Sequence, residues 1–108
     1  MSEEKTQEKI QQLQLMEQSM QQKKKKKQQF QSQIIELDSA LDELKDSKES
    51  YKIVGNIMVK SDSEDLKKDL TSKKEVVELR IKTLEKQEEK MREKSKKMQS
   101  EVVDKIKK

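Results

Sequence analysis

The chain has 108 residues, of which 44% are charged and 29% are hydrophobic, and its net charge is +4. It contains no Pro, no Cys and no His, which excludes disulfides, thiolate metal sites and the usual general bases and thiol nucleophiles. So few hydrophobic residues do not fill a conventional globular core, which leaves either a disordered chain or a thin apolar seam between helices.

The N-terminal part of the sequence predicts a long helix over residues 3–46. Its apolar residues recur at alternating steps of three and four, which places them along one stripe of a helix. These stripe residues are Leu13, Met16, Met20, Phe30, Ile34, Leu37, Leu41 and Leu44. Lys23 and Lys27 also occupy stripe positions, so we expect them to extend to solvent or to pair with Glu88.

The next segment, residues 51–60, predicts a β-hairpin. It is rich in β-branched and aromatic residues, and the dipeptide Gly55-Asn56 at its centre suits a two-residue turn. Gly55 is the only glycine of the chain. A tight turn is therefore easiest at this position.

A second helix is predicted over residues 63–105. Ser61 and Glu64 fit a capping box at its start, and lysines near its end favour a helix C-terminus. Its apolar stripe consists of Leu66, Leu70, Val77, Ile81, Leu84, Met91, Met98 and Val102.

The two stripes are mirror images about Gly55-Asn56. Residues at equal distances from this turn form the pairs Leu41–Leu70, Ile34–Val77, Lys27–Leu84, Met20–Met91 and Leu13–Met98. Two helices that fold back at the turn bring each pair together. The sequence therefore predicts a mainly α fold: a long antiparallel two-helix coiled-coil hairpin with a central β-hairpin, in a single domain over residues 1–108.

The apolar residues of the β-hairpin have no core beneath them in a monomer. A lone two-stranded hairpin is only marginally stable in water, and its outer edges are unpaired. Pairing with the hairpins of other subunits removes both costs, so we expect an oligomer. The residues expected to carry assembly are Tyr51, Ile53, Val54, Gly55, Ile57, Met58 and Val59.

Two interpretations remain for the run of lysines at residues 23–27. The run suits contact with an acidic partner, such as a tubulin-like acidic tail, or with nucleic acid. Five successive residues also point all round a helix, which favours a solvated patch. Acidic residues lie among the basic ones nearly everywhere else, so we expect no nucleic-acid partner.

Methionine is the main apolar residue in the parts of the helices that lie farthest from the turn in sequence. Met16, Met20, Met91 and Met98 are either ordinary seam residues or part of an adaptable binding surface, because Met is flexible and polarizable. Other apolar residues lie nearby, and they would help to form a partly exposed surface: Ile10, Leu13, Leu15, Val103 and Ile106.

Neither catalysis nor a membrane span is expected. Adjacent carboxylates such as Glu88 and Glu89 lie on a highly charged helix, where no base or nucleophile accompanies them. The sequence has no apolar run of about 18 residues, and its N-terminal residues lack the apolar segment of a signal peptide. We therefore expect a cytoplasmic protein without a cofactor or a metal.

The segment Tyr51–Lys60 reads Tyr-Lys-Ile-Val-Gly-Asn-Ile-Met-Val-Lys, and with its flanking helices it resembles the beta-class subunit of the prefoldin family. The resemblance continues through Glu78–Glu88 and covers nearly the whole chain. A single hairpin marks the beta class, since the alpha class carries two. The lysines at 23–27 depart from the family's usual pattern.

This resemblance implies a hetero-hexamer of two alpha-class and four beta-class subunits, whose hairpins assemble into β-barrels. It also implies that the coiled-coil arms hold unfolded client proteins without ATP and deliver them to a group II chaperonin. The client-binding residues it implies are Ile10, Leu13, Met16, Met20, Met91, Met98 and Val102. Two alternatives remain: a structural coiled-coil adaptor with one specific partner, and a basic coiled coil that binds nucleic acid.

Overall fold

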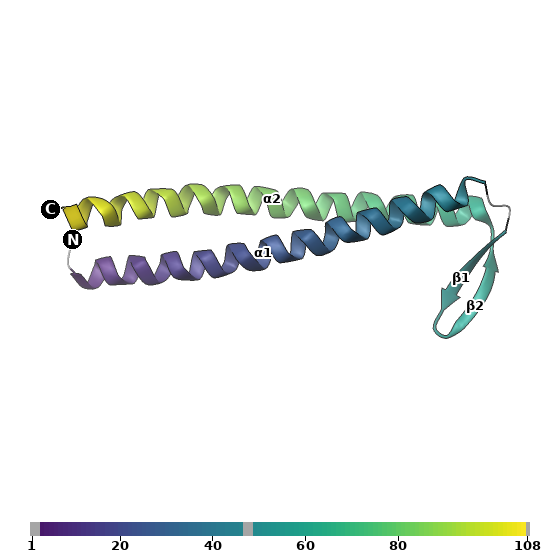
Figure 1. The fold of residues 1–108 in the computed structure, drawn as a ribbon, viewed down its shortest axis with the longest axis horizontal. Coiled ribbons are helices and arrows are strands. Elements are labelled where there is room, and N and C mark those ends of the chain that lie inside the picture. Colours follow the sequence, from purple (N-terminus) through teal and green to yellow (C-terminus); the bar gives the residue numbers. More distant parts are fainter. Residues whose placement is uncertain (1–2, 47–48, 108) are drawn as a thin grey trace. The chain divides into compact units, whose positions relative to one another are not determined.

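The computed structural model describes residues 3–46 and 49–107. The elements follow one another along the chain as a helix, two strands and a second helix (Figure 1). They are α1 (Glu3–Leu44), β1 (Ser50–Val54), β2 (Ile57–Ser61) and α2 (Ser63–Lys107). The predicted mainly helical fold with a central antiparallel hairpin is confirmed.

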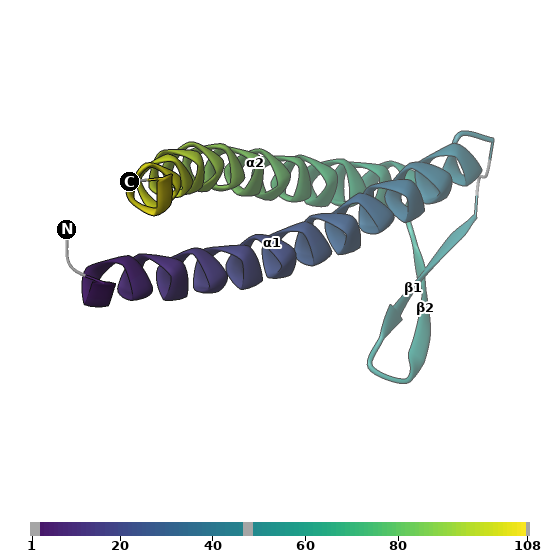
Figure 2. The same ribbon diagram turned by 60° about the vertical axis from the view of Figure 1, so that its left-hand side comes forward.

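The contacts within the chain divide it into two units. The terminal unit comprises residues 1–28 and 82–108, and the hairpin unit comprises residues 29–81. In each unit a part of α1 runs antiparallel beside a part of α2 (Figures 1 and 2). Both units are therefore built from the two helices together.

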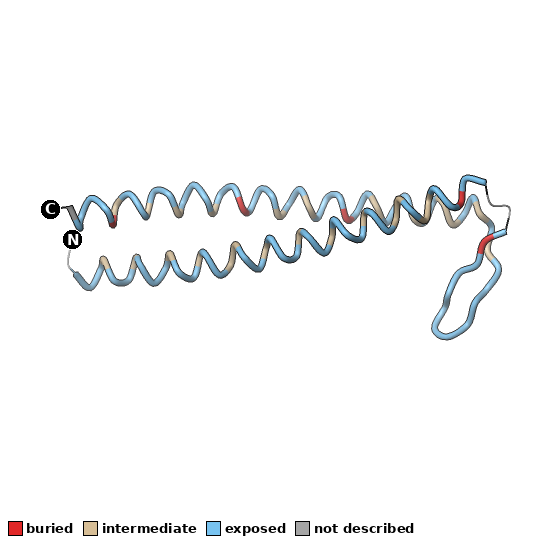
Figure 3. Tube along the Cα trace, viewed as in Figure 1, coloured by how far each residue is buried: buried red, intermediate tan, exposed pale blue. Residues whose placement is uncertain are grey.

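Burial along the helices follows the predicted stripes (Figure 3). Every apolar stripe residue expected on α1 and on α2 is half-buried or buried, while the residues between them are mostly exposed. The buried hydrophobic residues of the described part are Leu44, Val77 and Val102. The core is therefore a thin seam between helices, as the low hydrophobic content indicates.

Helix α1 ends at Leu44, two residues before the end that the sequence indicates. The backbone N–H of Lys45 donates to the carbonyl of Asp42 at 3.3 Å, which tightens the last turn into a three-residue step. The predicted helix residues 45 and 46 therefore lie in a bend.

The predicted capping box at Ser61 and Glu64 is wrong, because the cap of α2 is Asp62. The carboxylate of Asp62 accepts the backbone N–H of Glu64 at 2.8 Å, and its carbonyl accepts the N–H of Leu66 at 3.0 Å. A negative charge at this position also suits the positive end of the helix dipole. Ser61 belongs instead to β2, where its carbonyl accepts the hydroxyl of Ser50.

The strands β1 and β2 pair antiparallel around the predicted turn, with Val54 opposite Ile57. Gly55 has a φ of 62°, a left-handed conformation that glycine adopts without steric cost. Asn56, the second central residue, does not have a positive φ. Positive φ at the first central position alone is the arrangement of a type II′ turn, which matches the twist of the strands. The turn therefore lies at Gly55-Asn56, as the mirror symmetry of the stripes indicates.

Candidate assembly and binding surfaces

The β-hairpin exposes apolar side chains on both of its faces. Because opposite residues of an antiparallel pair share a face, the register defines two sets of side chains. One face carries Val54, Ile57, Lys52 and Val59, and the other carries Ile53, Met58, Tyr51 and Lys60. Ile53 is 71% exposed, Ile57 is 67% exposed and Met58 is 66% exposed. Neither face is covered by the described part of the chain.

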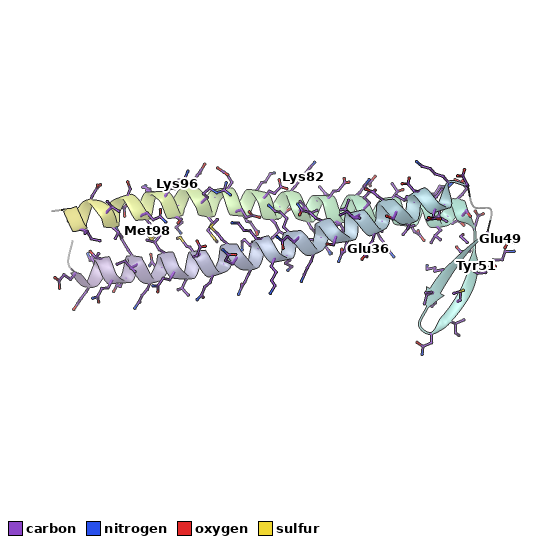
Figure 4. The ribbon with its side chains drawn as sticks, viewed as in Figure 1. Glu36, Glu49, Tyr51, Lys82, Lys96 and Met98 are labelled. Atoms are coloured by element: carbon purple, nitrogen blue, oxygen red, sulfur yellow. The ribbon has the colours of Figure 1, made fainter. Side chains whose placement is uncertain are left out.

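The hairpin projects from the helices of its unit in both views, with Tyr51 near its base (Figures 1, 2 and 4). Its sheet has two strands, so each strand keeps one edge that no other described strand pairs with. The hairpin thus offers two faces and two edges at once. Such an element is suited to entering a larger sheet formed with other chains.

Hydrogen bonds among one buried and two half-buried serines hold the base of the hairpin. The Ser50 hydroxyl donates to the carbonyl of Ser61 at 2.9 Å, and the Ser63 hydroxyl donates to that of Ser50 at 3.3 Å. Ser50 is only 6% exposed. Reasoning from the sequence missed this cluster, although Ser50 and Ser61 lie at equal distances from the turn. These bonds connect β1, β2 and the first residue of α2.

Most of the residues predicted to bind clients lie in the seam of the terminal unit. Leu13, Met16 and Met20 on α1 and Met91 and Met98 on α2 are all half-buried. Figure 4 shows Met98 on the side of α2 that faces α1, whereas Lys96 points away.

Three other apolar residues of the terminal unit lie outside that seam. The exposed fractions are 64% for Leu15, 45% for Val103 and 70% for Ile106. Of the predicted client-binding residues, Ile10 is 37% exposed and Val102 only 7%. The terminal unit therefore combines a half-buried, methionine-rich seam with apolar residues on its outer surface.

A charged pair interrupts this seam. The ammonium of Lys27 lies 3.2 Å from Oε1 of Glu88 and donates to Oε2 at 3.5 Å. The Glu88 side chain is 5% exposed and that of Lys27 is 24% exposed. The expected pairing with Glu88 is thus made by Lys27. Lys23, which lies as far from the turn in sequence as Glu88, instead donates to the hydroxyl of Ser19.

The direction of side chains on a helix explains this choice of partner. Side chains lean toward the N-terminus of their own helix, so Lys27 reaches toward the level of Lys23. Glu88 leans in the opposite sense, because α2 runs antiparallel to α1. The two side chains therefore meet between their layers.

Ion pairs between α1 and α2 also occur elsewhere, with one further pair in the terminal unit and one in the hairpin unit among the described residues. In the terminal unit Lys9 donates to Glu101, and this hydrogen bond lowers the pKa of the Glu101 carboxyl. In the hairpin unit the ammonium of Lys74 lies 2.6 Å from Asp38. The hydrogen bond to Asp38 raises the pKa of Lys74. Both shifts favour the charged forms that make the pairs.

An aromatic contact adds to the seam of the hairpin unit. The guanidinium of Arg80 lies 5.9 Å from the centroid of the Phe30 ring, within the range of a cation–π interaction. Arg80 also borders a shallow groove that passes over Leu37, Val76 and Val77. The guanidinium of Arg80 thus lies over one face of the Phe30 ring.

None of the helices, over the residues that the structure describes, is long and apolar enough to cross a membrane. The same residues contain no group of three or more His, Cys, Asp or Glu side chains placed to hold a metal ion.

Two antiparallel helices with a seam of heptad positions and an exposed β-hairpin at their connection define a helical-hairpin subunit of the coiled-coil class. A family model described as "Prefoldin subunit" matches residues 7–108. The chain therefore belongs to the prefoldin family, which confirms the resemblance seen at Tyr51–Lys60.

Individual relatives agree with the family assignment. The chain is 45% identical to the prefoldin subunit beta of Archaeoglobus fulgidus over 78% of its own length and 75% of that protein. It is 35% identical to the prefoldin subunit beta of Methanospirillum hungatei over 94% of its length and 88% of that protein.

A solved structure has the same fold. The crystal structure of the prefoldin beta subunit from Thermococcus strain KS-1 matches with a TM-score of 0.89 and 30% identity, covering 96% of this chain and 94% of that one. The agreement extends over both helices and the hairpin, because almost the whole of each chain is matched.

Proposed function

We propose that residues 1–108 act as one prefoldin-like domain, the beta-class subunit of an ATP-independent holdase in the cytoplasm. The subunit assembles with alpha-class partners through its hairpin, in a hetero-hexamer of two alpha and four beta subunits. It holds non-native proteins at the ends of its helices and delivers them to a group II chaperonin. This function requires neither catalysis nor a cofactor.

The observation that carries the proposal is the half-buried, methionine-rich seam of the terminal unit. A holdase needs apolar surface that does not collapse into its own core, and it needs charge around that surface to stay in solution. The half-buried methionines and the exposed Leu15, Val103 and Ile106 supply apolar surface. Because Met changes its rotamer easily, such a surface adapts to clients of different shape.

Assembly supports this function by multiplying weak contacts. Each subunit contributes one terminal unit, and several units on one complex raise the effective concentration for a bound client. The hairpin residues Tyr51, Ile53, Val54, Gly55, Ile57, Met58 and Val59 are all exposed, as an element that pairs with other chains requires. An assembled sheet would bury their apolar side chains and pair the strand edges.

The test replaces the four seam methionines, Met16, Met20, Met91 and Met98, by Gln. A matched variant replaces the same four residues by Leu, which keeps the surface apolar. Light scattering of a chemically denatured client, diluted into buffer without nucleotide, measures protection. We expect the Gln variant to lose most of its protection and the Leu variant to keep it, with the assembly mass of both unchanged.

Equal protection by the Gln variant in an intact assembly would show that these methionines do not bind clients. Several unrelated clients should be used, because a holdase protects all of them. Protection of a single client would instead support the coiled-coil adaptor.

A further inference from the structure

The longest stretch without an acidic residue lies in α1 between Glu17 and Glu36. It contains the five lysines at 23–27, and the remaining polar residues are Gln and Ser. Elsewhere in the helices acidic and basic residues are interspersed. This stretch therefore carries only positive charge, and the roles described for the seam and the hairpin do not explain why so many lysines gather there.

The structure divides these five lysines into two groups. Lys27 pairs with Glu88 in the seam, and Lys23 is half-buried and donates to Ser19. Lys24, Lys25 and Lys26 are exposed, and we call these three the lysine face. The described residues supply no ion pair to any of the three.

The three lysines are consecutive, so their side chains do not face one another across the helix surface, but their like charges add and attract an anion to this part of α1. Exposed Gln22 and Gln28 border the lysine face, and their amides are further donors for carboxylates. The amide of the neighbouring Gln21 already donates to Glu17 at 3.2 Å. The surface therefore presents several donors and positive charges, and the nearest acidic residue along α1, Glu17, is bound by Gln21 and makes no ion pair with the lysine face among the described residues.

We propose that the lysine face binds acidic segments, rich in Asp and Glu, of non-native client polypeptides. This inference rests on the proposed holdase function and adds charge selection to it. Apolar client residues contact the seam and the outer apolar residues of the terminal unit. An acidic segment of the same client binds the lysine face, so that acidic clients are held more tightly than neutral ones.

The arrangement favours a short acidic peptide over nucleic acid. Successive residues are roughly 100° apart around a helix, so the three lysines curve around α1 and do not form a straight track. On α2 of the same unit, exposed Glu85, Glu89 and Glu93 alternate with exposed lysines, so α2 does not extend the lysine face into a continuous basic track for a long polyanion. A flexible peptide with a few carboxylates curves around α1 and avoids these residues.

The binding test uses a fluorescein-labelled peptide of ten glutamates and the full chain in its assembly, with fluorescence anisotropy as the readout. The variant is Lys24→Gln, Lys25→Gln and Lys26→Gln together. The matched control is Lys94→Gln, Lys96→Gln and Lys97→Gln, which removes the same charge from exposed lysines of α2. We expect the variant to lose affinity about tenfold and the control less than about twofold.

Equal losses in the two variants would mean that only net charge matters, and that outcome would overturn the proposal. Absence of salt-sensitive binding by the unchanged chain would overturn it as well. A single-stranded oligothymidine is the second probe. If it binds more tightly than the glutamate peptide and is lost in the same variant, the surface is a nucleic-acid site and the proposal is wrong.

Light scattering separates this inference from the holdase function. One denatured client is used with and without a tail of ten glutamates. We expect the unchanged chain to protect the tailed client better than the untailed one. The lysine-face variant should protect the untailed client as well as the unchanged chain does, and it should protect the tailed client no better than the untailed one. If the unchanged chain protects neither client, the holdase function fails, and the peptide affinities still decide whether the lysine face binds acidic segments.

Discussion

The seam of the hairpin unit and the seam of the terminal unit differ in the side chains at their stripe positions. On α1 the hairpin unit fills its stripe with aromatic and branched aliphatic residues, which end at the buried Leu44. The terminal unit places Lys23 and Lys27 in the same stripe. On α2 it adds the buried Glu88, and Met supplies much of the remaining apolar contact.

The two units therefore use the same heptad pattern for different purposes. Branched residues have few rotamers and pack into a defined seam, so the hairpin unit provides a stable base for the β-hairpin. Most apolar stripe residues are half-buried in both units, but Met changes its rotamer more easily than branched residues do, so the seam of the terminal unit is more adaptable. The first unit thus uses its seam for stability, and we propose that the second uses it for binding.

The largest effect expected from a single substitution concerns the hairpin. Ile53→Asp places a carboxylate where the proposed assembly buries an apolar residue, at a cost of several kcal/mol. Such a cost weakens association by at least about a hundredfold, so sedimentation should show dissociated subunits. The helices should remain folded by circular dichroism.

Ile35→Asp is the control for the hairpin substitution. Ile35 is 67% exposed on α1 in the same unit, so the same chemical change should leave the assembly intact. If both variants keep the mass of the unchanged complex, the hairpin is not the assembly element. If both dissociate, the effect is not specific to the hairpin.

Truncation of a leucine in each unit tests the comparison of the seams directly. Leu44 is 7% exposed, so Leu44→Ala should lower the free energy of unfolding by about 2–3 kcal/mol. Leu13 is half-buried in the terminal unit, and Leu13→Ala should cost less than half as much. Urea titrations followed by circular dichroism measure both values. Equal losses would show that the two seams are packed alike.

The charged layer of the terminal unit is tested by removing one or both charges. Lys27→Met leaves Glu88 buried without its partner and should cost about 1–2 kcal/mol. This is less than for a fully buried pair, because Lys27 is 24% exposed. Replacing both residues, by Lys27→Met with Glu88→Leu, should restore or exceed the original stability. A double variant less stable than Lys27→Met would contradict this account of the layer.

Reasoning from the sequence predicted the helices, the turn and the residues that face the seam. The spacing of apolar residues determines which side of a long helix packs against its neighbour. The position of the turn was predictable because Gly55 is the only glycine of the chain. The exposure of the hairpin residues was also predictable, because two strands have too few neighbours to be covered. These features depend on local pattern alone.

Features that depend on three-dimensional register were harder to predict. Ser61 and Asp62 are both good capping residues, and only the pairing of Ser61 with Ser50 in the ladder leaves Asp62 as the cap. Likewise, the spacing places Lys23 level with Glu88, but side-chain direction brings Lys27 to it. Spacing also places the terminal methionines in the seam without fixing how much of each side chain stays exposed.

The smallest expected effect is the response of the two units to pH. In the terminal unit, the hydrogen bond from Lys9 lowers the pKa of Glu101 from its usual value of 4.5. The pair therefore contributes stability above about pH 4.5 and loses it as the pH falls through the lowered pKa. In the hairpin unit, the pKa of Lys74 is raised above 10.5, so its contribution is complete below that pH and is lost at higher pH.

Glu101→Gln should therefore lower the melting temperature slightly at pH 7, and this effect should shrink as the pH falls through the lowered pKa of Glu101. The difference is small, because the Glu101 side chain is 43% exposed and water screens the pair. Glu93→Gln is the control, since Glu93 is exposed and has no ion pair with another described residue. Melting curves between pH 3 and pH 7 measure both variants. If the difference for Glu101→Gln is as large at pH 3 as at pH 7, the effect comes from packing, and the charge of the Lys9–Glu101 pair contributes nothing to the terminal unit.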